Sequence, residues 1–164
     1  MHRRVPVARH CYGCLLGTTR GAWMNFCVIG HRGAAGHAPE NTMAAFACAQ
    51  RMGLSDVELD VRLSRDGVLV LFNGASLGEK TPLVGRVEDY EVVELVQADV
   101  GRWFDAVRGD GSETHAGETL TTLVDVVARF GASLRYHVEL KGASRSCLRV
   151  PWRCAARIRR LSSW

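Results

Sequence analysis

Three acidic residues near the ends of predicted strands have the types and spacing to bind a divalent cation. Glu58 and Asp60 lie in the run 56–61, where polar and apolar residues alternate strictly. This alternation is typical of a strand, and it directs both carboxylates to one face, where oxygen ligands suit Mg²⁺ or Ca²⁺. Glu139 lies late in another predicted strand, 134–140. Solvated acids at strand ends, or salt-bridge partners, would give the same pattern.

Two basic residues follow the first predicted strand. The apolar run 27–30 ends at His31 and Arg32, where α/β folds place their active sites. An imidazole titrates near neutral pH, and a guanidinium can donate two hydrogen bonds to a phosphate. A histidine bonded to loop backbone and an arginine in a surface ion pair are the alternative. No partner pattern accompanies the other central histidines, which we interpret as structural or exposed: His37, His115 and His137.

The segments that must position these residues alternate between strand and helix patterns. A helix is predicted to begin at Asn41 or Thr42 and to end near Met52, before Gly53. The order β, α, β, β, α, α, β favours parallel strands with helical crossovers, and therefore a barrel or a doubly wound sheet. The other predicted elements are strands at 27–30, 56–61, 68–72 and 134–140 and helices at 87–95 and 123–130.

Several strings resemble the signature of the glycerophosphodiester phosphodiesterase family. The resemblance begins with the twelve residues His31-Arg32-Gly33-Ala34-Ala35-Gly36-His37-Ala38-Pro39-Glu40-Asn41-Thr42. It continues through Glu58-Leu59-Asp60-Val61, Asp66-Gly67-Val68, Gly85-Arg86-Val87, Gly117-Glu118, Thr122-Leu123 and Val138-Glu139-Leu140-Lys141. It covers residues 27–142, which we interpret as one partial domain.

The resemblance implies an α/β fold that is part of a TIM (β/α) barrel, with about the first four strands and their helices. It also implies hydrolysis of glycerophosphodiesters to an alcohol and glycerol 3-phosphate with a divalent cation, Mg²⁺ or Ca²⁺, within lipid metabolism. Glu40 matches a polar signature position whose role we do not assign. By position, the implied metal ligands are Glu58, Asp60 and Glu139, the implied catalytic residue is His31, and the implied phosphate-binding residues are Arg32 and Lys141.

Two departures from the family pattern lower the activity that we expect. The family follows the strand corresponding to 68–72 with a His-Asp pair, whereas this chain has Asn73-Gly74, and asparagine cannot transfer a proton at neutral pH. A complete barrel takes ~250 residues, and the resemblance stops at about the fourth strand. We therefore expect weak or no activity in a truncated form, with possible self-association through an open barrel edge. A non-catalytic phosphate-binding or metal-binding relative, or a truncated isoform with a regulatory role, is the alternative.

The two ends of the chain are basic, and the middle is acidic. We interpret residues 1–26 as a basic extension and residues 143–164 as an arginine-rich tail that does not match the family. Neither segment contains an acid, so all 17 acidic residues lie in the middle of the chain, and we expect no nucleic-acid partner. No apolar run approaches the ~20 residues that span a bilayer. We expect a cytoplasmic location, with a mitochondrion or another organelle as the alternative because the N-terminus carries arginine and no acid.

Overall fold

The computed structural model describes residues 27–109, residues 114–142 and the strand at 158–160. The predicted extension 1–26 and most of the predicted tail 143–164 lie outside the described residues. Within the described part of the chain, no helix has the length and apolar character needed to cross a membrane.

A five-stranded sheet organises the fold, with β2 (Asp56–Leu63) at its centre. β2 pairs in parallel with β1 (Ile29–Gly30) and with β4 (Arg135–Leu140). β5 (Ile158–Arg160) pairs in parallel with β4, so part of the predicted tail contributes a strand. β3 (Leu69–Leu71) pairs antiparallel with the carboxyl end of β2. The described strands do not close into a barrel, and the prediction of a partial barrel is confirmed.

The sequence predicts parallel pairing of the strands, whereas β2 and β3 pair antiparallel. The segment between β2 and β3 is the short turn 64–68, and a parallel pair needs a crossover of a dozen or more residues. Val68 N and Ser64 Oγ are 2.9 Å apart, and Ser64 N donates to Val68 O at 2.9 Å, which closes a hairpin. The parallel strands in the described part of the chain are therefore β1, β2, β4 and β5.

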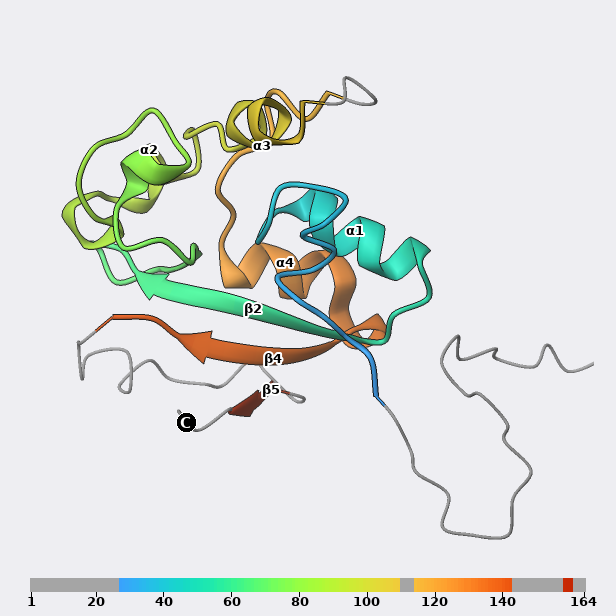
Figure 1. Cartoon of the computed structure of the whole chain (residues 1–164). Coiled ribbons are helices and arrows are strands. Elements are labelled where there is room, and N and C mark those ends of the chain that lie inside the picture. Colours follow the sequence, from blue (N-terminus) through green and yellow to red (C-terminus); the bar gives the residue numbers. More distant parts are fainter. Residues whose placement is uncertain (1–26, 110–113, 143–157, 161–164) are drawn as a thin grey trace, which may run out of the picture.

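Two helices cover one face of the β2–β4 pair (Figure 1). α1 (Met43–Arg51) begins after Thr42, whose hydroxyl accepts a hydrogen bond from Ala45 N at 3.2 Å. α4 (Leu123–Phe130) begins after Thr122, whose hydroxyl accepts one from Asp125 N at 3.1 Å. These side-chain caps satisfy backbone donors that a helix leaves unpaired in its first turn, and both helices begin where the sequence predicts them.

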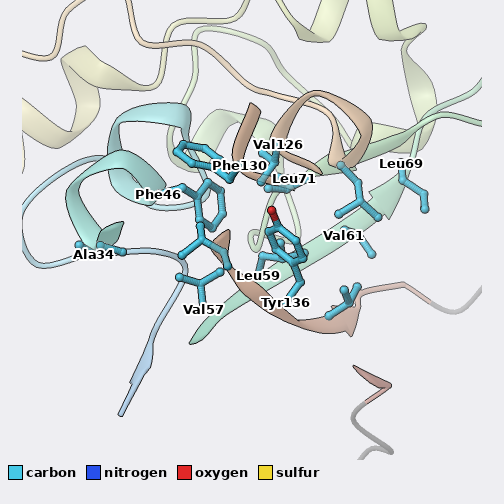
Figure 2. Close-up of a cluster of buried hydrophobic side chains, with 14 residues drawn as sticks. Ala34, Phe46, Val57, Leu59, Val61, Leu69, Leu71, Val126, Phe130 and Tyr136 are labelled. Carbon is cyan, nitrogen blue, oxygen red and sulfur yellow. The ribbon is translucent and has the colours of Figure 1, made fainter. Parts of the chain in front are cut away.

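The main hydrophobic core lies between these helices and the sheet (Figure 2). Phe46 of α1 and Phe130 of α4 meet edge to face, with ring centroids 6.3 Å apart. Each fully buried side chain of this kind stabilises the fold by ~1.5–3 kcal/mol. The sheet contributes alternate residues of three strands, which are Val57, Leu59 and Val61 of β2, Leu69 and Leu71 of β3, and Tyr136 and Val138 of β4.

A second cluster lies between β3 and the segment that leads to α4. It includes α2 (Val92–Leu95), and α3 (Gly101–Arg108) packs beside it. The helix predicted over 87–95 is interrupted, because Tyr90 is extended with φ −119° and ψ 152° between a 3-10 turn and α2. The cluster is formed by Val70, Phe72, Leu77, Val87, Leu95, Ala98, Val100 and Leu120.

Candidate active site at the carboxyl edge of the sheet

The three predicted acidic ligands lie together at one end of two neighbouring strands. Glu58 and Asp60 are on the face of β2 opposite the core, and Asp60 is the register partner of Glu139 on β4. Figure 1 shows the arrowheads of β2 and β4 pointing the same way, so these ends are side by side. One carboxylate oxygen from each of the three residues lies within 4.8 Å of the other two.

Asp60 is completely buried and is held by an asparagine from the loop after β1. Asn41 Nδ2 donates to Asp60 Oδ2, and Asp60 N donates to Asn41 Oδ1, both at 3.1 Å. The other carboxylate oxygen, Asp60 Oδ1, is buried without a hydrogen-bond partner among the described residues. A buried carboxylate oxygen is costly to leave without a hydrogen bond, and the positive group beside this atom is Lys141, whose Nζ lies 3.3 Å away.

Two basic side chains flank Asp60. Arg32 Nε lies 3.1 Å from Asp60 Oδ2, and Lys141 Nζ lies 3.3 Å from Asp60 Oδ1, both as ion pairs without hydrogen-bond geometry. Lys141 also donates to Glu139 Oε1 at 2.5 Å. Arg32 has a positive φ of 52° and donates its backbone N–H to Glu58 Oε2 at 2.9 Å. This conformation is uncommon for a residue other than glycine and places both the backbone and the guanidinium of Arg32 against the acids.

The three carboxylates repel one another, and the repulsion is visible in Glu58. Burial, followed by the charges of Asp60 and Glu139, raises the pKa of Glu58 to about 7 despite the hydrogen bond from Arg32. For Lys141, burial lowers the pKa, but Glu139 and Asp60 outweigh it and hold the pKa above its usual value. A divalent cation among the acids would relieve their repulsion. The residues present therefore fit such an ion.

Glu40, to which the sequence assigns no role, connects two cations beside the acids. Its carboxylate accepts from Arg32 Nη1 at 2.8 Å and from Lys80 Nζ at 2.6 Å. Lys80 Nζ lies 5.2 Å from the centroid of the Trp103 ring and 5.9 Å from that of Phe72. Sequence patterns alone do not indicate Lys80 or Trp103, because neither belongs to the resembling strings and α3, which carries Trp103, is not predicted.

His31 and Asn73 lie at the same edge of the sheet. His31 directly follows β1, next to the backbone N–H that Glu58 accepts, and its side chain is exposed. Asn73 follows Phe72, whose N–H donates to Asp60 O at 3.1 Å. The backbone carbonyl of Asn73 accepts a hydrogen bond from Arg62 Nη2 at 3.3 Å. A cavity of about 10 Å³, bordered by Glu40, Asn73, Lys80 and Trp103, has room for at most one water molecule.

The remaining histidines in the centre of the chain have varied settings. His137 Nε2 lies 2.9 Å from Asp56 Oδ1, on the same face of the sheet as the three acids. His115 Nδ1 lies 3.0 Å from Asp105 Oδ1. Both histidines are therefore held by carboxylates, which agrees with a structural interpretation.

The sequence profile described as "Glycerophosphoryl diester phosphodiesterase family" matches residues 31–152. The chain belongs to this family. The match to the family profile continues past residue 142, where we expected the partial domain to end. A glycerophosphodiester phosphodiesterase from Bacillus subtilis is 31% identical over 83% of the chain and 45% of its own length. One from Caldanaerobacter subterraneus is 37% identical over 72% of the chain and 46% of its own length.

Solved structures of glycerophosphodiester phosphodiesterases share the fold. The enzyme from Agrobacterium tumefaciens aligns with a TM-score of 0.63 and 32% identity, over 71% of this chain and 48% of that protein. A phosphodiesterase from Oleispira antarctica, solved with the product sn-glycerol-3-phosphate, aligns with a TM-score of 0.58 and 34% identity, over 70% and 45% of the two chains. The chain thus spans about half the length of the family members that it matches.

Proposed function

We propose that this chain is a metal-dependent phosphoric diester hydrolase that acts on glycerophosphodiesters, and that its turnover is slow. The observation that carries this proposal is the convergence of three carboxylates within 4.8 Å, flanked by Arg32 and Lys141. Carboxylates alone would attract cations, whereas a phosphodiester needs positive groups as well. The acids and the cations lie at the sheet edge where α/β folds assemble active sites.

Glu58, Asp60 and Glu139 would hold the cation, and Mg²⁺ or Ca²⁺ suits an all-oxygen ligand set. When bound, a divalent cation polarises the phosphoryl oxygens and offsets the negative charge that develops on them. Arg32 and Lys141 contribute fixed positive charge beside Asp60, and their donors suit the other phosphoryl oxygens. Asn41 keeps the Asp60 carboxylate oriented through its two hydrogen bonds.

The balance of charge favours a diester over a monoester. The three acids carry three negative charges, Arg32 and Lys141 carry two positive charges, and Glu40 pairs with Lys80. With a divalent cation, the site has a net charge of about plus one, which a phosphodiester monoanion neutralises. A monoester dianion would leave the site negative. Because unbalanced charge is costly even in a partly buried site, this balance favours the diester.

Hydrolysis requires proton transfer at two oxygens. A water oxygen forms a bond to phosphorus and loses a proton, while the bond from phosphorus to the alcohol oxygen breaks and that oxygen gains a proton. His31 directly follows β1 at this edge of the sheet. We assign one of the two proton transfers to its imidazole. Asn73 occupies the position where the family has a second histidine, and its amide cannot perform the other transfer. We therefore propose slow turnover.

A second candidate function is metal-dependent phosphate binding without catalysis. Asn73 is the observation that favours it, since the groups that would bind a cation and a phosphate remain in place while one proton-transfer group is replaced. The two candidates differ in turnover and share the binding site.

An assay with glycerophosphocholine and either Mg²⁺ or Ca²⁺ tests the proposal. We expect slow release of glycerol 3-phosphate that stops with a chelator and in the Glu58→Gln, Asp60→Asn double variant. The variant Glu94→Gln, which changes an exposed acid on α2, should retain the wild-type rate. Cation binding without turnover would favour the second candidate. Equal calorimetric heats of cation binding for the wild type and the double variant would contradict both.

A further inference from the structure

A second cleft, away from the three acids, lies between α1 and the α3 region. Its volume is about 620 Å³, which is in the range of small-molecule sites. It borders on the same loop after β1 that carries Arg32 and Glu40, through His37 and Ala38. α1 contributes Ala44, Cys48 and Arg51, which recur on one face of the helix.

One wall of this cleft contains a firmly held histidine. The carboxylate of Asp105, on α3, accepts from His115 N at 2.9 Å and lies 3.0 Å from His115 Nδ1. The His115 ring meets Phe104 edge to face at 5.0 Å between centroids. At Gly101, an added Cβ would lie 1.6 Å from the carbonyl oxygen of His115. This close backbone contact is possible only with glycine, and it fixes His115 against the start of α3.

The free ring nitrogen of His115 is suited to a ligand. Because Nδ1 is engaged with Asp105, the other nitrogen, Nε2, lies on the opposite side of the ring. Nε2 has no hydrogen-bond partner among the described residues, and His115, although only 8% exposed, lines the cleft. Asp105 at Nδ1 fixes the orientation of the ring, and Nε2 can form a hydrogen bond with a phosphoryl group as donor or acceptor.

Two guanidinium groups add positive charge to the cleft. Arg51 comes from the last turn of α1, and Arg108 from the last turn of α3. Arg108 Nη1 donates to the carbonyl of His37 at 3.3 Å, which fixes its charge between α3 and the loop after β1. Of the acids, only Glu118 lines the cleft among the described residues. Among the described lining residues, two guanidinium groups therefore stand against one carboxylate.

We propose that this cleft binds a small phosphate monoester, with Arg51, Arg108 and His115 contacting the phosphoryl oxygens. Guanidinium groups suit phosphate because they donate paired, charge-assisted hydrogen bonds. The volume of the cleft exceeds that of a phosphate ion and accommodates an organic portion. This site is separate from the three acids and needs no metal ion.

Cys48 provides a reporter for occupancy, because this free thiol lines the cleft. The alkylation rate of Cys48 is measured by peptide mass spectrometry, in the presence of EDTA, with glycerol 3-phosphate or with inorganic phosphate. Exposed Cys27 is the internal control, since it precedes β1 and does not line the cleft. We expect glycerol 3-phosphate to slow alkylation of Cys48 several-fold and to leave Cys27 unchanged. Equal protection by inorganic phosphate would support the site and show that the phosphoryl group alone is recognised.

Three variants separate this site from the active site. Arg51→Gln, on an exposed side chain, and His115→Gln should each reduce the protection of Cys48, whereas Arg129→Gln at the end of α4 should retain it. Circular dichroism confirms that each variant is folded, and Arg51→Gln alone suffices if His115→Gln unfolds. The Glu58→Gln, Asp60→Asn variant should retain protection. Protection lost only in that variant would place the ligand at the active site and overturn this proposal. Unprotected Cys48 in the wild type would also overturn it, without bearing on the proposed hydrolase function.

Discussion

Asn41 and Asp60 exchange two hydrogen bonds, each 3.1 Å long. The Asn41 side-chain amide donates to the Asp60 carboxylate, and the Asp60 backbone N–H donates to the Asn41 amide oxygen. The exchange connects the loop after β1 to the centre of β2 and fixes which oxygen of Asp60 remains without a partner. Asn41 itself has a positive φ of 59°, a conformation that asparagine tolerates better than most residues. One residue therefore determines both the loop conformation and the orientation of a proposed ligand.

Replacing Asn41 should separate these two roles. We expect Asn41→Ala to lower the free energy of unfolding by ~1–3 kcal/mol, because buried hydrogen-bond partners are left unpaired, with a further ~1–2 kcal/mol from the left-handed backbone. Asn41→Gly should show only the first loss. Both variants should weaken Mg²⁺ binding similarly in calorimetric titration. Wild-type affinity in Asn41→Gly would show that the amide does not orient Asp60.

Cation binding should depend on pH through Glu58. Because its pKa is raised to about 7, Glu58 is protonated below this pH, and a protonated carboxyl is a poor ligand. Affinity for Mg²⁺ or Ca²⁺ should therefore rise from about pH 6 to about pH 8. Calorimetry across this range provides the measurement. A Glu58→Gln variant should bind more weakly and show a flatter pH profile.

The same group should affect the stability of the metal-free protein in the opposite direction. Since the folded-state pKa of Glu58 lies above its unfolded value of 4.5, the folded state binds the proton more tightly. This contribution to stability is complete below the unfolded pKa and is lost as the pH rises through about 7. Denaturant unfolding with EDTA should show a smaller decline over this range in Glu58→Gln than in the wild type. Identical declines would contradict the assignment.

Placing histidine at position 73, as the resemblance implies, should raise turnover little in this chain. Asn73→His adds a proton-transfer group, which contributes ~10²–10⁴-fold to rate in a complete site, but this chain spans only about half the length of its relatives. Release of glycerol 3-phosphate measures the rate, and Asn73→Ala is the matched control. A large gain in Asn73→His would show that Asn73 is the main defect.

Gly74→Asp should not be neutral in this chain, although the resemblance implies aspartate at that position. An added Cβ would lie 2.8 Å from the Phe72 ring and 3.0 Å from Glu79 Oε2, so the new carboxylate would collide with the ring and repel Glu79. We expect a loss of ~1–3 kcal/mol in the free energy of unfolding. The double change Gly74→Asp, Glu79→Ala should recover part of this loss. Full stability of Gly74→Asp alone would show that Phe72 and Glu79 move aside.

The bridge between Glu40 and Lys80 should be strongly coupled. Both side chains are mostly buried, so a double-mutant cycle with Glu40→Gln and Lys80→Met should give a coupling energy of ~0.5–3 kcal/mol in urea unfolding. The exposed pair of Arg65 and Glu91 is the control and should give ~0–1 kcal/mol. Equal coupling in the two pairs would show that water screens the Glu40 bridge as well.

The sequence predicts elements well where a local pattern agrees with tertiary packing. The alternation in 56–61 predicts β2, which extends to Leu63, and the caps Thr42 and Thr122 predict where α1 and α4 begin. The three acids are predicted as neighbours because parallel strands place their carboxyl ends at one edge, which the register of Asp60 with Glu139 confirms.

Prediction from sequence fails where distant contacts decide the local structure. The helix expected over 87–95 is broken because Tyr90 O accepts from Arg65 N at 2.8 Å and Val92 N donates to Asp66 Oδ1 at 3.0 Å. Both partners lie in the β2–β3 turn. Lys80 contacts Glu40 and lies over the ring of Trp103 through tertiary packing of segments that are distant in the sequence, and no spacing in the sequence encodes this approach.

The strict alternation of β2 has a consequence for how this chain can change over evolution. Its odd positions Val57, Leu59 and Val61 form the core, and its even positions Glu58 and Asp60 form the proposed metal site. Inserting or deleting a single residue near Val57 would exchange the two faces of the strand beyond that point. Such a change would remove the core and the metal site together. A point substitution at Glu58 or Asp60 can therefore change the proposed metal site alone, whereas a length change within β2 would disrupt the fold as well.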